Sequence, residues 1–501
     1  MPLFAPVTQR SRLARREPVR CAERSARVVA ATLAASLALA GCATPVLQPA
    51  VDVPARFAAA DSAVEADPEV AWWESYNDPV LTDLIRRAAR ENRDVKIAAE
   101  RVRAARAGAT ISRSWLMPSI SAVGGGLHQD TGYDAIKRQA LPDTDVAVGG
   151  IGVSWEVDLS GRLRAGATAA EADALAVEHG KRGVRLLVLT DVATHYFTLV
   201  GASRQLDTVR AISAAQDETL RLVTARQRVG LATPFDVERA QTEASQARAA
   251  IPPLETAVAI SRHRIAVLIG DQAFNAATIT PSSGEPIAPL ARAGQPAALL
   301  ERRPDLLAAK AQLDAANARR QQAYAEWFPR LFVGALFGRG SADVNDFSLG
   351  AARYTSAAAL LAMPIFNAGR TQAINESAEA GQSEAVLHYE DAIVRALEDV
   401  ENALVADRNQ RQRTDTLAAA AASAEAAFGR AQSLYNRGQI DLLPLLDAQR
   451  TRLAVRVSAN DSHTQRLLDS VQLYKALGGG WQVFEPDSQP AATTAARSPH
   501  S

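Results

Sequence analysis

The sequence predicts a mixed but mainly α-helical protein, with long coiled-coil-like helices and two β-hairpins. The helices are predicted from two runs, 167–229 and 371–437, which contain no proline and few glycines. At a rise of about 1.5 Å per residue, each run would extend over roughly 90–100 Å. Helices of that length need neighbours along their sides, because no globular core is so long. We therefore expect layers of packed helices rather than a single compact core.

The hairpins are predicted from alternating residues in two segments. From Ile151 to Leu159 every second residue is apolar and the others are polar or glycine, which is typical of a strand with one apolar face. Its expected partner is 119–128, across a polar loop. In the second segment, a weaker alternation over 331–338 is expected to pair with 347–365, across a loop near 340–346.

Each predicted strand is long enough to cross an outer membrane at a tilt, but four strands cannot close a barrel. An open sheet edge in lipid would leave backbone hydrogen-bonding groups without partners. If the strands are transmembrane, several chains must therefore share one barrel. The alternative is a pair of soluble hairpins that cap a helical bundle.

The chain reads as two copies of one pattern, and we expect repeats at 76–285 and 286–480. Short motifs recur in the same order about 208 residues apart, as Gly230 and Gly438 do, and chance does not readily produce such a series. The polar residues that follow, 481–501, are expected to form a disordered tail.

The N-terminus predicts export and lipid anchoring. Residues 1–41 combine an arginine-rich start with an apolar stretch too short to span a bilayer, as in a signal peptide. They end in Leu-Ala-Gly before Cys42, which resembles the processing site of bacterial lipoproteins, so Cys42 is the expected site of acylation. The alternative is an ordinary secretory signal. Residues 42–75 are expected to form an extended anchor segment.

The composition excludes several classes of protein. The 55 basic residues balance the 55 acidic ones, so the basic field of a nucleic-acid-binding protein is missing. Two cysteines and seven scattered histidines offer no zinc-binding pattern or disulfide framework. We find no nucleophile–base pair and no phosphate-binding loop. The chain is therefore expected to bind no nucleic acid, metal or other cofactor, and not to be an enzyme.

Several motifs, in their order along the chain, resemble those of the TolC-type outer membrane factor family, in the lipoprotein branch that serves tripartite efflux pumps. The motifs are Trp72-Trp73 with Asp78-Pro79-Val80-Leu81, Arg303-Pro304-Asp305-Leu306, Trp327-Phe328-Pro329, Asn367-Ala368-Gly369-Arg370, Tyr435-Asn436-Arg437-Gly438 and Leu445-Leu446-Asp447-Ala448-Gln449-Arg450. Together with the duplication, the resemblance covers about residues 70–480.

The resemblance implies a homotrimer, in which a 12-stranded transmembrane β-barrel continues into a 12-helix α-barrel. The trimer would be anchored in outer-membrane lipid and extend into the periplasm. There it would dock on a membrane-fusion (adaptor) protein and on an inner-membrane transporter of the RND type, and it would passively export drugs or other small toxic compounds. Two alternatives stay open: the exit duct of a type I protein-secretion system, and a lipid-anchored coiled-coil scaffold that forms no channel.

By the same resemblance, the turns at Gly230 and Gly438 constrict the periplasmic entrance. Asp447 falls where related channels place a ring of carboxylates, which would attract cations; the alternative is a solvated carboxylate beside a helix turn. Asp236 and Tyr435 align with positions that hydrogen-bond between neighbouring helices and hold the entrance closed. For Asp236 the alternative is a helix N-cap, because it lies near a predicted helix start.

Arg303, Pro304 and Asp305 are expected to be structural. Proline at the first position of a helix, with an acidic residue beside it, favours helix initiation and complements the helix dipole. We therefore assign this motif to folding rather than to transport.

Overall fold

The computed structural model describes most of the chain, in two compact units. It covers residues 45–59, 69–132, 142–271, 273, 279–282, 284, 286–290, 292–345 and 347–485. The signal peptide and the acylation site expected at Cys42 lie outside these residues. The strand unit includes Trp115–Ala165 and Arg319–Ser377, and the helical unit includes Leu47–Ser114, Gly166–Ala318 and the chain from Ala378 onward.

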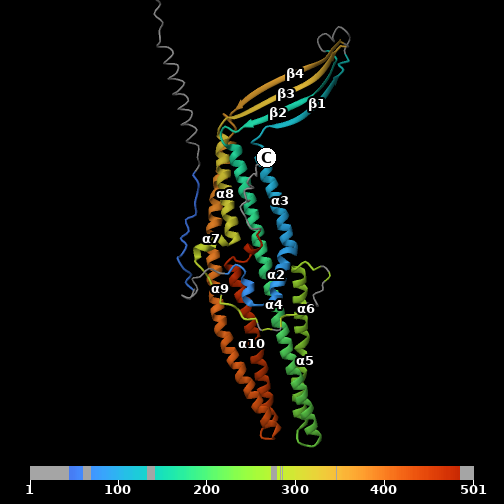
Figure 1. The fold of residues 1–501 in the computed structure, drawn as a ribbon, viewed down its shortest axis with the longest axis vertical. Helices are drawn as coiled ribbons and strands as arrows, with labels where there is room; N and C mark the ends of the chain where they lie inside the picture. The colour runs from blue at the N-terminus through green and yellow to red at the C-terminus, as the bar shows by residue number, and fades with distance from the viewer. Residues whose placement is uncertain are drawn as a thin grey trace, which may run out of the picture. The chain divides into compact units, whose positions relative to one another are not determined.

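The strand unit contains a four-stranded antiparallel sheet (Figure 1). Its strands, in spatial order, are β1 (Ser119–Gln129), β2 (Thr144–Val157), β3 (Arg330–Val344) and β4 (Phe347–Ala362). The two predicted hairpins are confirmed. In addition β2 pairs with β3 along its whole length, so one sheet joins the two repeats.

The second hairpin differs from its predicted bounds at both ends. The loop predicted near 340–346 is too long, because β3 continues to Val344 with Gly340 and Ser341 still paired to β4. Strand β4 ends at Ala362 rather than at 365. Pro364 follows closely, and proline has no backbone N–H to donate to the sheet.

The register gives the sheet two different faces. On one face Ile151 lies beside Phe337, and on the other Gly150 lies beside Gly338. A side chain at Gly150 would collide with the backbone of β3. A side chain at Gly338 would likewise collide with the backbone of β2, so this face is crowded, as expected on the concave side of a curved sheet. On the apolar face Ile151 and Phe337 are 54% and 49% exposed. The apolar face is therefore the outer, convex one.

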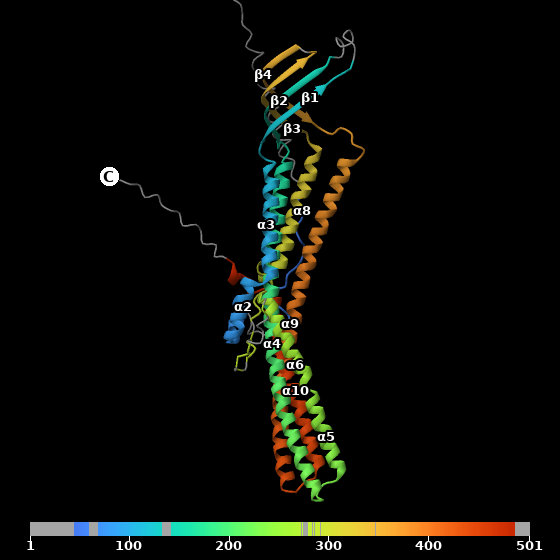
Figure 2. The ribbon, with the colours of Figure 1, turned by 90° about the vertical axis from the view of Figure 1, so that its right-hand side faces the viewer.

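The longest elements are two helices of 67 residues each, α4 (Arg162–Arg228) and α9 (Arg370–Asn436) (Figures 1 and 2). They confirm the two long runs predicted from the sequence to within a few residues. Each helix starts directly after a glycine with positive φ, Gly161 at 79° and Gly369 at 84°. Only glycine adopts such a conformation without strain, which explains why both boundaries were predictable.

Both long helices turn back at the same end of the helical unit (Figure 2). Helix α4 is followed by α5 (Pro234–Ala249) and α6 (Ile251–Leu268), whereas α9 is followed by the uninterrupted α10 (Leu442–Ala476). The break between α5 and α6 has a local cause. Pro252 and Pro253 lack the backbone N–H groups that a continuous helix would need at these positions.

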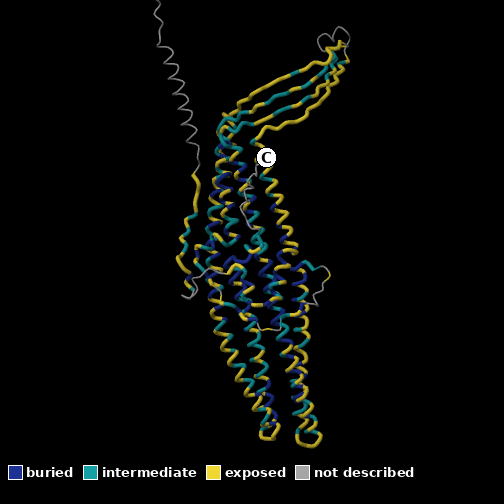
Figure 3. Tube along the Cα trace, viewed as in Figure 1, coloured by how far each residue is buried: buried dark blue, intermediate teal, exposed yellow. Residues whose placement is uncertain are grey.

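The core of the helical unit lies where the shorter helices meet α4, α9 and α10 (Figure 3). Trp72, Trp73, Tyr196 and Phe197 are completely buried there, and the ring of Trp72 stacks on Tyr474 at 5.3 Å between centroids. The shorter helices of this unit are η1 (Trp72–Tyr76), α2 (Pro79–Glu91), α3 (Arg93–Ser114), η4 (Pro296–Ala298), α7 (Leu299–Arg302) and α8 (Pro304–Tyr324). The short helix η5 (Ala325–Trp327) belongs to the strand unit.

The segment ahead of the helices is extended where it is described. Residues 45–54 form neither helix nor strand. The backbone N–H of Ala50 donates to Glu390 at 2.8 Å, and that of Ala58 donates to Glu401 at 2.6 Å. Since both glutamates belong to α9, this segment lies along that helix.

The disordered tail predicted from residue 481 is placed too early in the sequence, because residues 481–485 are ordered. Trp481–Phe484 forms the short helix η6, and Trp481 is buried with its indole N–H donating to the Arg302 carbonyl at 3.1 Å. Glu485 meets three cations of α4, which are Lys181, Arg182 and Arg185. One aromatic ring and one carboxylate therefore fix a segment whose neighbours in the sequence are polar.

Candidate channel entrance

The two hairpin turns at the common end of the helical unit have the same backbone geometry (Figures 1 and 2). Gly230 has φ 75° and Gly438 has φ 71°. After Gly230, the N–H of Leu231 donates back to the Arg226 carbonyl at 2.9 Å; after Gly438, the N–H of Gln439 donates to the Leu434 carbonyl at 3.0 Å. This is the usual way in which a helix ends at a left-handed glycine. The predicted turns are thus placed at the same end.

A small apolar cluster, separate from the main core, packs the two hairpins together just behind these turns. Since its residues come from all four helices, the hairpins are tied to each other by hydrophobic contact rather than by the turns themselves. The buried members are Val223 of α4, Ala240 of α5, Phe428 and Tyr435 of α9, and Leu442, Leu445 and Leu446 of α10.

Tyr435 anchors α9 to α4. Its side chain is buried, and the guanidinium of Arg226 lies 4.2 Å from the centre of its ring. The same guanidinium donates to the Tyr435 carbonyl at 3.2 Å. A cation over an aromatic ring in a partly buried place is stabilising, so this contact joins the ends of the two long helices.

Asp236 belongs to the first turn of α5. Its carboxylate accepts from the Thr233 backbone N–H at 2.9 Å and from the Thr233 hydroxyl at 2.8 Å, while Thr233 caps the helix. These bonds, the backbone one first, lower the pKa of the Asp236 carboxyl. Asp236 therefore occupies the N3 position of a capping box and is not the N-cap itself. Within the described chain it forms no hydrogen bond with Tyr435.

Asp447 lies exposed on α10, directly after the buried Leu445 and Leu446. Nearby, Arg450 pairs with Glu243 of α5 at 2.5 Å, and this partner, followed by the charge of Asp447, raises the pKa of Arg450. Asp447 itself has no ion pair in the part of the chain that the structure describes. Its carboxylate is therefore free to face solvent or a second copy of the chain.

In the motif Arg303-Pro304-Asp305, the arginine makes contacts to distant helices that the sequence did not indicate. The guanidinium of Arg303, whose side chain is 11% exposed, donates to Asp305 at 2.7 Å, to Asp399 of α9 at 3.0 Å and to the Ala476 carbonyl at the end of α10 at 3.1 Å. Burial opposes its charge, but the two carboxylates outweigh burial and raise the pKa of Arg303.

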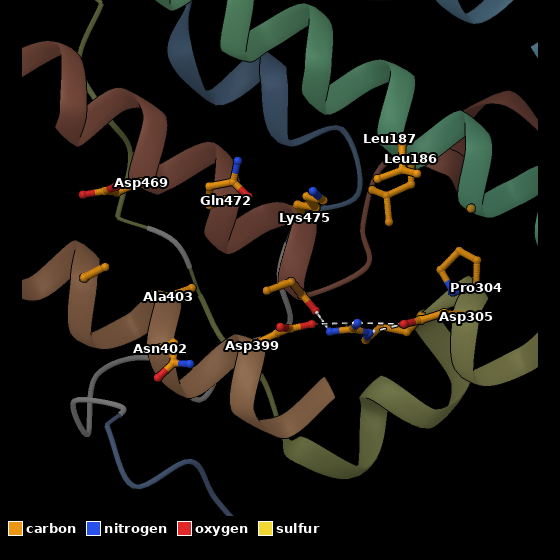
Figure 4. A pocket seen from close by; sticks show the side chains of 14 residues that line it. Leu186, Leu187, Pro304, Asp305, Asp399, Asn402, Ala403, Asp469, Gln472 and Lys475 are labelled. Atoms are coloured by element: carbon orange, nitrogen blue, oxygen red, sulfur yellow. Dashed lines mark hydrogen bonds and ion pairs between the residues drawn. The ribbon is translucent and has the colours of Figure 1, made fainter. Parts of the chain in front are cut away.

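Arg303 borders a cavity of about 600 Å³ (Figure 4). Lys475 and Asp469 of α10 and Asn402 of α9 line it as well. No group of three or more metal-ligating side chains occurs in the described ranges. The cavity lies at the junction of α8, α9 and α10.

A sheet with two free edges, together with long paired helical hairpins whose turns share one end, defines the class of barrel-and-tube export channels. The family model described as Outer membrane efflux protein matches residues 84–271 and 296–479. The chain belongs to the outer membrane efflux protein family.

Individual relatives agree with this. The chain is 34% identical over 421 residues to the pyoverdine export outer membrane protein OpmQ of Pseudomonas aeruginosa, covering 82% of this chain and 87% of that one. It is 30% identical over 429 residues to the solvent efflux pump outer membrane protein SrpC of Pseudomonas putida, covering 82% and 88%. The solved outer-membrane channel OprN matches at a TM-score of 0.78 with 27% identity, covering 88% and 100%.

The chain is therefore an outer-membrane protein with a periplasmic extension. It acts as the exit channel of a tripartite efflux system, in a family whose members form trimers, and it is not an enzyme.

Proposed function

We propose that three copies of this chain close a 12-stranded barrel through β1 and β4, and a 12-helix tube through their long helices. The observation that carries the proposal is the sheet itself: β1 and β4 have no further strand partner among the described residues. Such edges are untenable in lipid. Three identical sheets joined edge to edge remove all of them, and Cys42 would add an acyl anchor.

The channel is proposed to work with a periplasmic adaptor protein and an inner-membrane transporter of the RND type.

 Its relatives carry names that refer to pyoverdine in one case and to solvents in another. The two relatives are about equally similar to this chain, yet their names refer to very different compounds. The outer-membrane channel itself is therefore proposed to discriminate little between compounds, and the transporter is proposed to select the cargo. The cargo proposed for this chain is drugs or other small toxic compounds.

The periplasmic entrance is proposed to lie at the turns around Gly230 and Gly438. In a trimer, three copies of Asp447 would form a ring of carboxylates that attracts cations. Asp236 and Tyr435 are proposed to keep the entrance closed by stiffening the two hairpins. Asp236 holds the first turn of α5, and Tyr435 holds α9 against α4.

The test is single-channel conductance of the purified trimer in a planar bilayer. We expect discrete cation-selective openings, and a reversal potential that moves toward zero in the Asp447→Asn variant. Asp441→Asn is the matched control, because Asp441 is exposed, belongs to the same hairpin and makes no side-chain capping bond.

Equal changes in both variants would mean that general surface charge, not a ring at Asp447, sets the selectivity. A trimer that shows no openings under any applied voltage, with either variant, would contradict the proposed channel entrance.

A further inference from the structure

One row of residues crosses the whole sheet on its apolar, convex face. The pairing places Gly124 of β1 beside Gly149 of β2, Gly149 beside Arg339 of β3, and Arg339 beside Arg353 of β4. Residues directly opposite on neighbouring strands have their Cβ atoms about 5 Å apart. Two arginines therefore stand side by side next to two residues without side chains.

Two adjacent like charges destabilise a sheet unless something neutralises them. Both side chains are exposed, and within the described residues neither guanidinium forms an ion pair. Among the paired residues of β2 and β3, the nearest acidic ones on this face are Asp145 and Asp343, four positions further along and on the order of 13 Å away. Asp145 is already paired with His128. Among the residues that the structure describes, the arginine pair thus has no anionic partner.

The row of Arg339 and Arg353 borders the band of apolar residues on the convex face, which on β3 runs from Leu331 to Phe337. Ile151 and Phe337 occupy the next row on the same face, and Leu331 marks the beginning of the band on β3. From Leu331 to Arg339 the strand advances roughly 27 Å, or about 20 Å along the membrane normal at the usual tilt. Since the lipid-facing band of such barrels is about 25 Å tall, the arginines reach the level of the lipid headgroups.

The surroundings leave room for a headgroup. In the row beyond the arginines, Gly126, Ala147, Ser341 and Ala351 face the same side. No long side chain of the sheet covers the two guanidinium groups from there. Two guanidinium groups surrounded by small residues, with apolar side chains beside them, suit a ligand that has both a phosphate group and acyl chains.

We propose that Arg339 and Arg353 form a binding site for the phosphate group of an outer-leaflet lipid. Arginine can hold phosphate oxygens with two parallel hydrogen bonds, and the acyl chains of the same lipid would cover the apolar row at Ile151 and Phe337. The site rests on the proposed function, because it requires the apolar face to meet the membrane.

The test compares lipid binding by the detergent-solubilised trimer and by the R339Q/R353Q variant, using native mass spectrometry. The probes are phosphorylated lipid A, the same lipid with its phosphates removed, and inorganic phosphate alone. We expect the variant to bind phosphorylated lipid A roughly tenfold more weakly than the wild type. The dephosphorylated lipid should bind equally weakly to both.

R101Q/R103Q is the matched control, since it removes two exposed arginines of α3 and should leave lipid binding unchanged. Equal binding of the phosphorylated and dephosphorylated lipids by the wild type would overturn the site. If inorganic phosphate bound as tightly as lipid A, the ligand of this site would be a free anion and not a lipid, and the proposal would be wrong. Trimer mass and conductance, measured on the same samples, report separately on the proposed function.

Discussion

At the scale of single residues, Arg303 shows how one buried side chain joins distant parts of the chain. It contacts Asp305, Asp399 and the Ala476 carbonyl, which belong to three different helices. The sequence indicates a helix start at Pro304, because that signal is local. The partners in α9 and α10 lie far away along the chain, and no local pattern predicts them.

Arg303→Ala should lower the stability of the helical unit by about 2 kcal/mol. The loss stays moderate because Asp305 and Asp399 are more than half exposed and water can solvate them again. Thermal unfolding of the detergent-solubilised protein measures the change. Arg103→Ala, which removes an 81% exposed side chain from a surface pair, should change stability by less than about 0.5 kcal/mol. Equal losses in the two variants would contradict the role of Arg303.

Gly201 of α4 packs directly against Thr464 of α10. A Cβ atom there would collide with the side chain of Thr464, whose hydroxyl already donates to the Asn460 carbonyl at 2.9 Å. Gly201→Ala should therefore cost about 1–3 kcal/mol, and adding Thr464→Ala should recover part of the loss. In the same thermal measurement Gly180→Ala, which meets no atom within 4 Å, should be neutral or stabilising. A neutral Gly201→Ala would show that the two helices separate easily.

At the scale of elements, the capping box of α5 makes the start of this helix sensitive to pH. The lowered pKa of Asp236 means that its stabilisation is complete above the ordinary value of 3.8 and is lost as the pH falls through the lowered one. Amide exchange of the first turn of α5 should therefore accelerate at acid pH, after correction for the intrinsic rate.

Asp236→Ala should destabilise this turn by about 1 kcal/mol at neutral pH and remove the acid-dependent change. Asp441→Ala is the control, because Asp441 precedes α10 without a side-chain capping bond. An acid-dependent change that persists in Asp236→Ala would assign it to another group.

The lengths of the elements follow from local signals, and the exceptions show where such signals fail. Glycines before α4 and α9 and prolines within the α5–α6 segment act on the backbone directly, so they are readable in sequence. The fold of Trp481–Phe484 depends on partners in α4 and α7. The same is true of the contact between Arg226 and Tyr435. Contacts of this kind become visible only once the chain has folded.

At the scale of the whole molecule, the free edges predict contacts between copies. A cysteine at Ala122 of β1, combined with a second one at Ala351, Ala357 or Ala359 of β4, should give covalent trimers after oxidation for at least one pair. All four positions lie on the convex face. Gel electrophoresis without reducing agent measures the product, and the single-cysteine variants serve as controls. Only monomers in every pair would contradict closure through these edges.

The pairing of β2 with β3 has a consequence for biogenesis. The partner residues of these two strands are separated by roughly 170–200 positions, as in Val157 with Leu331 and Thr144 with Val344. The first hairpin must therefore wait, with an unpaired edge, until the second repeat has crossed the inner membrane. During that interval α4, α5 and α6 can already fold from local contacts. Secretion of the chain thus imposes an order on assembly, in which helical structure comes first and insertion of the sheet into the outer membrane comes last.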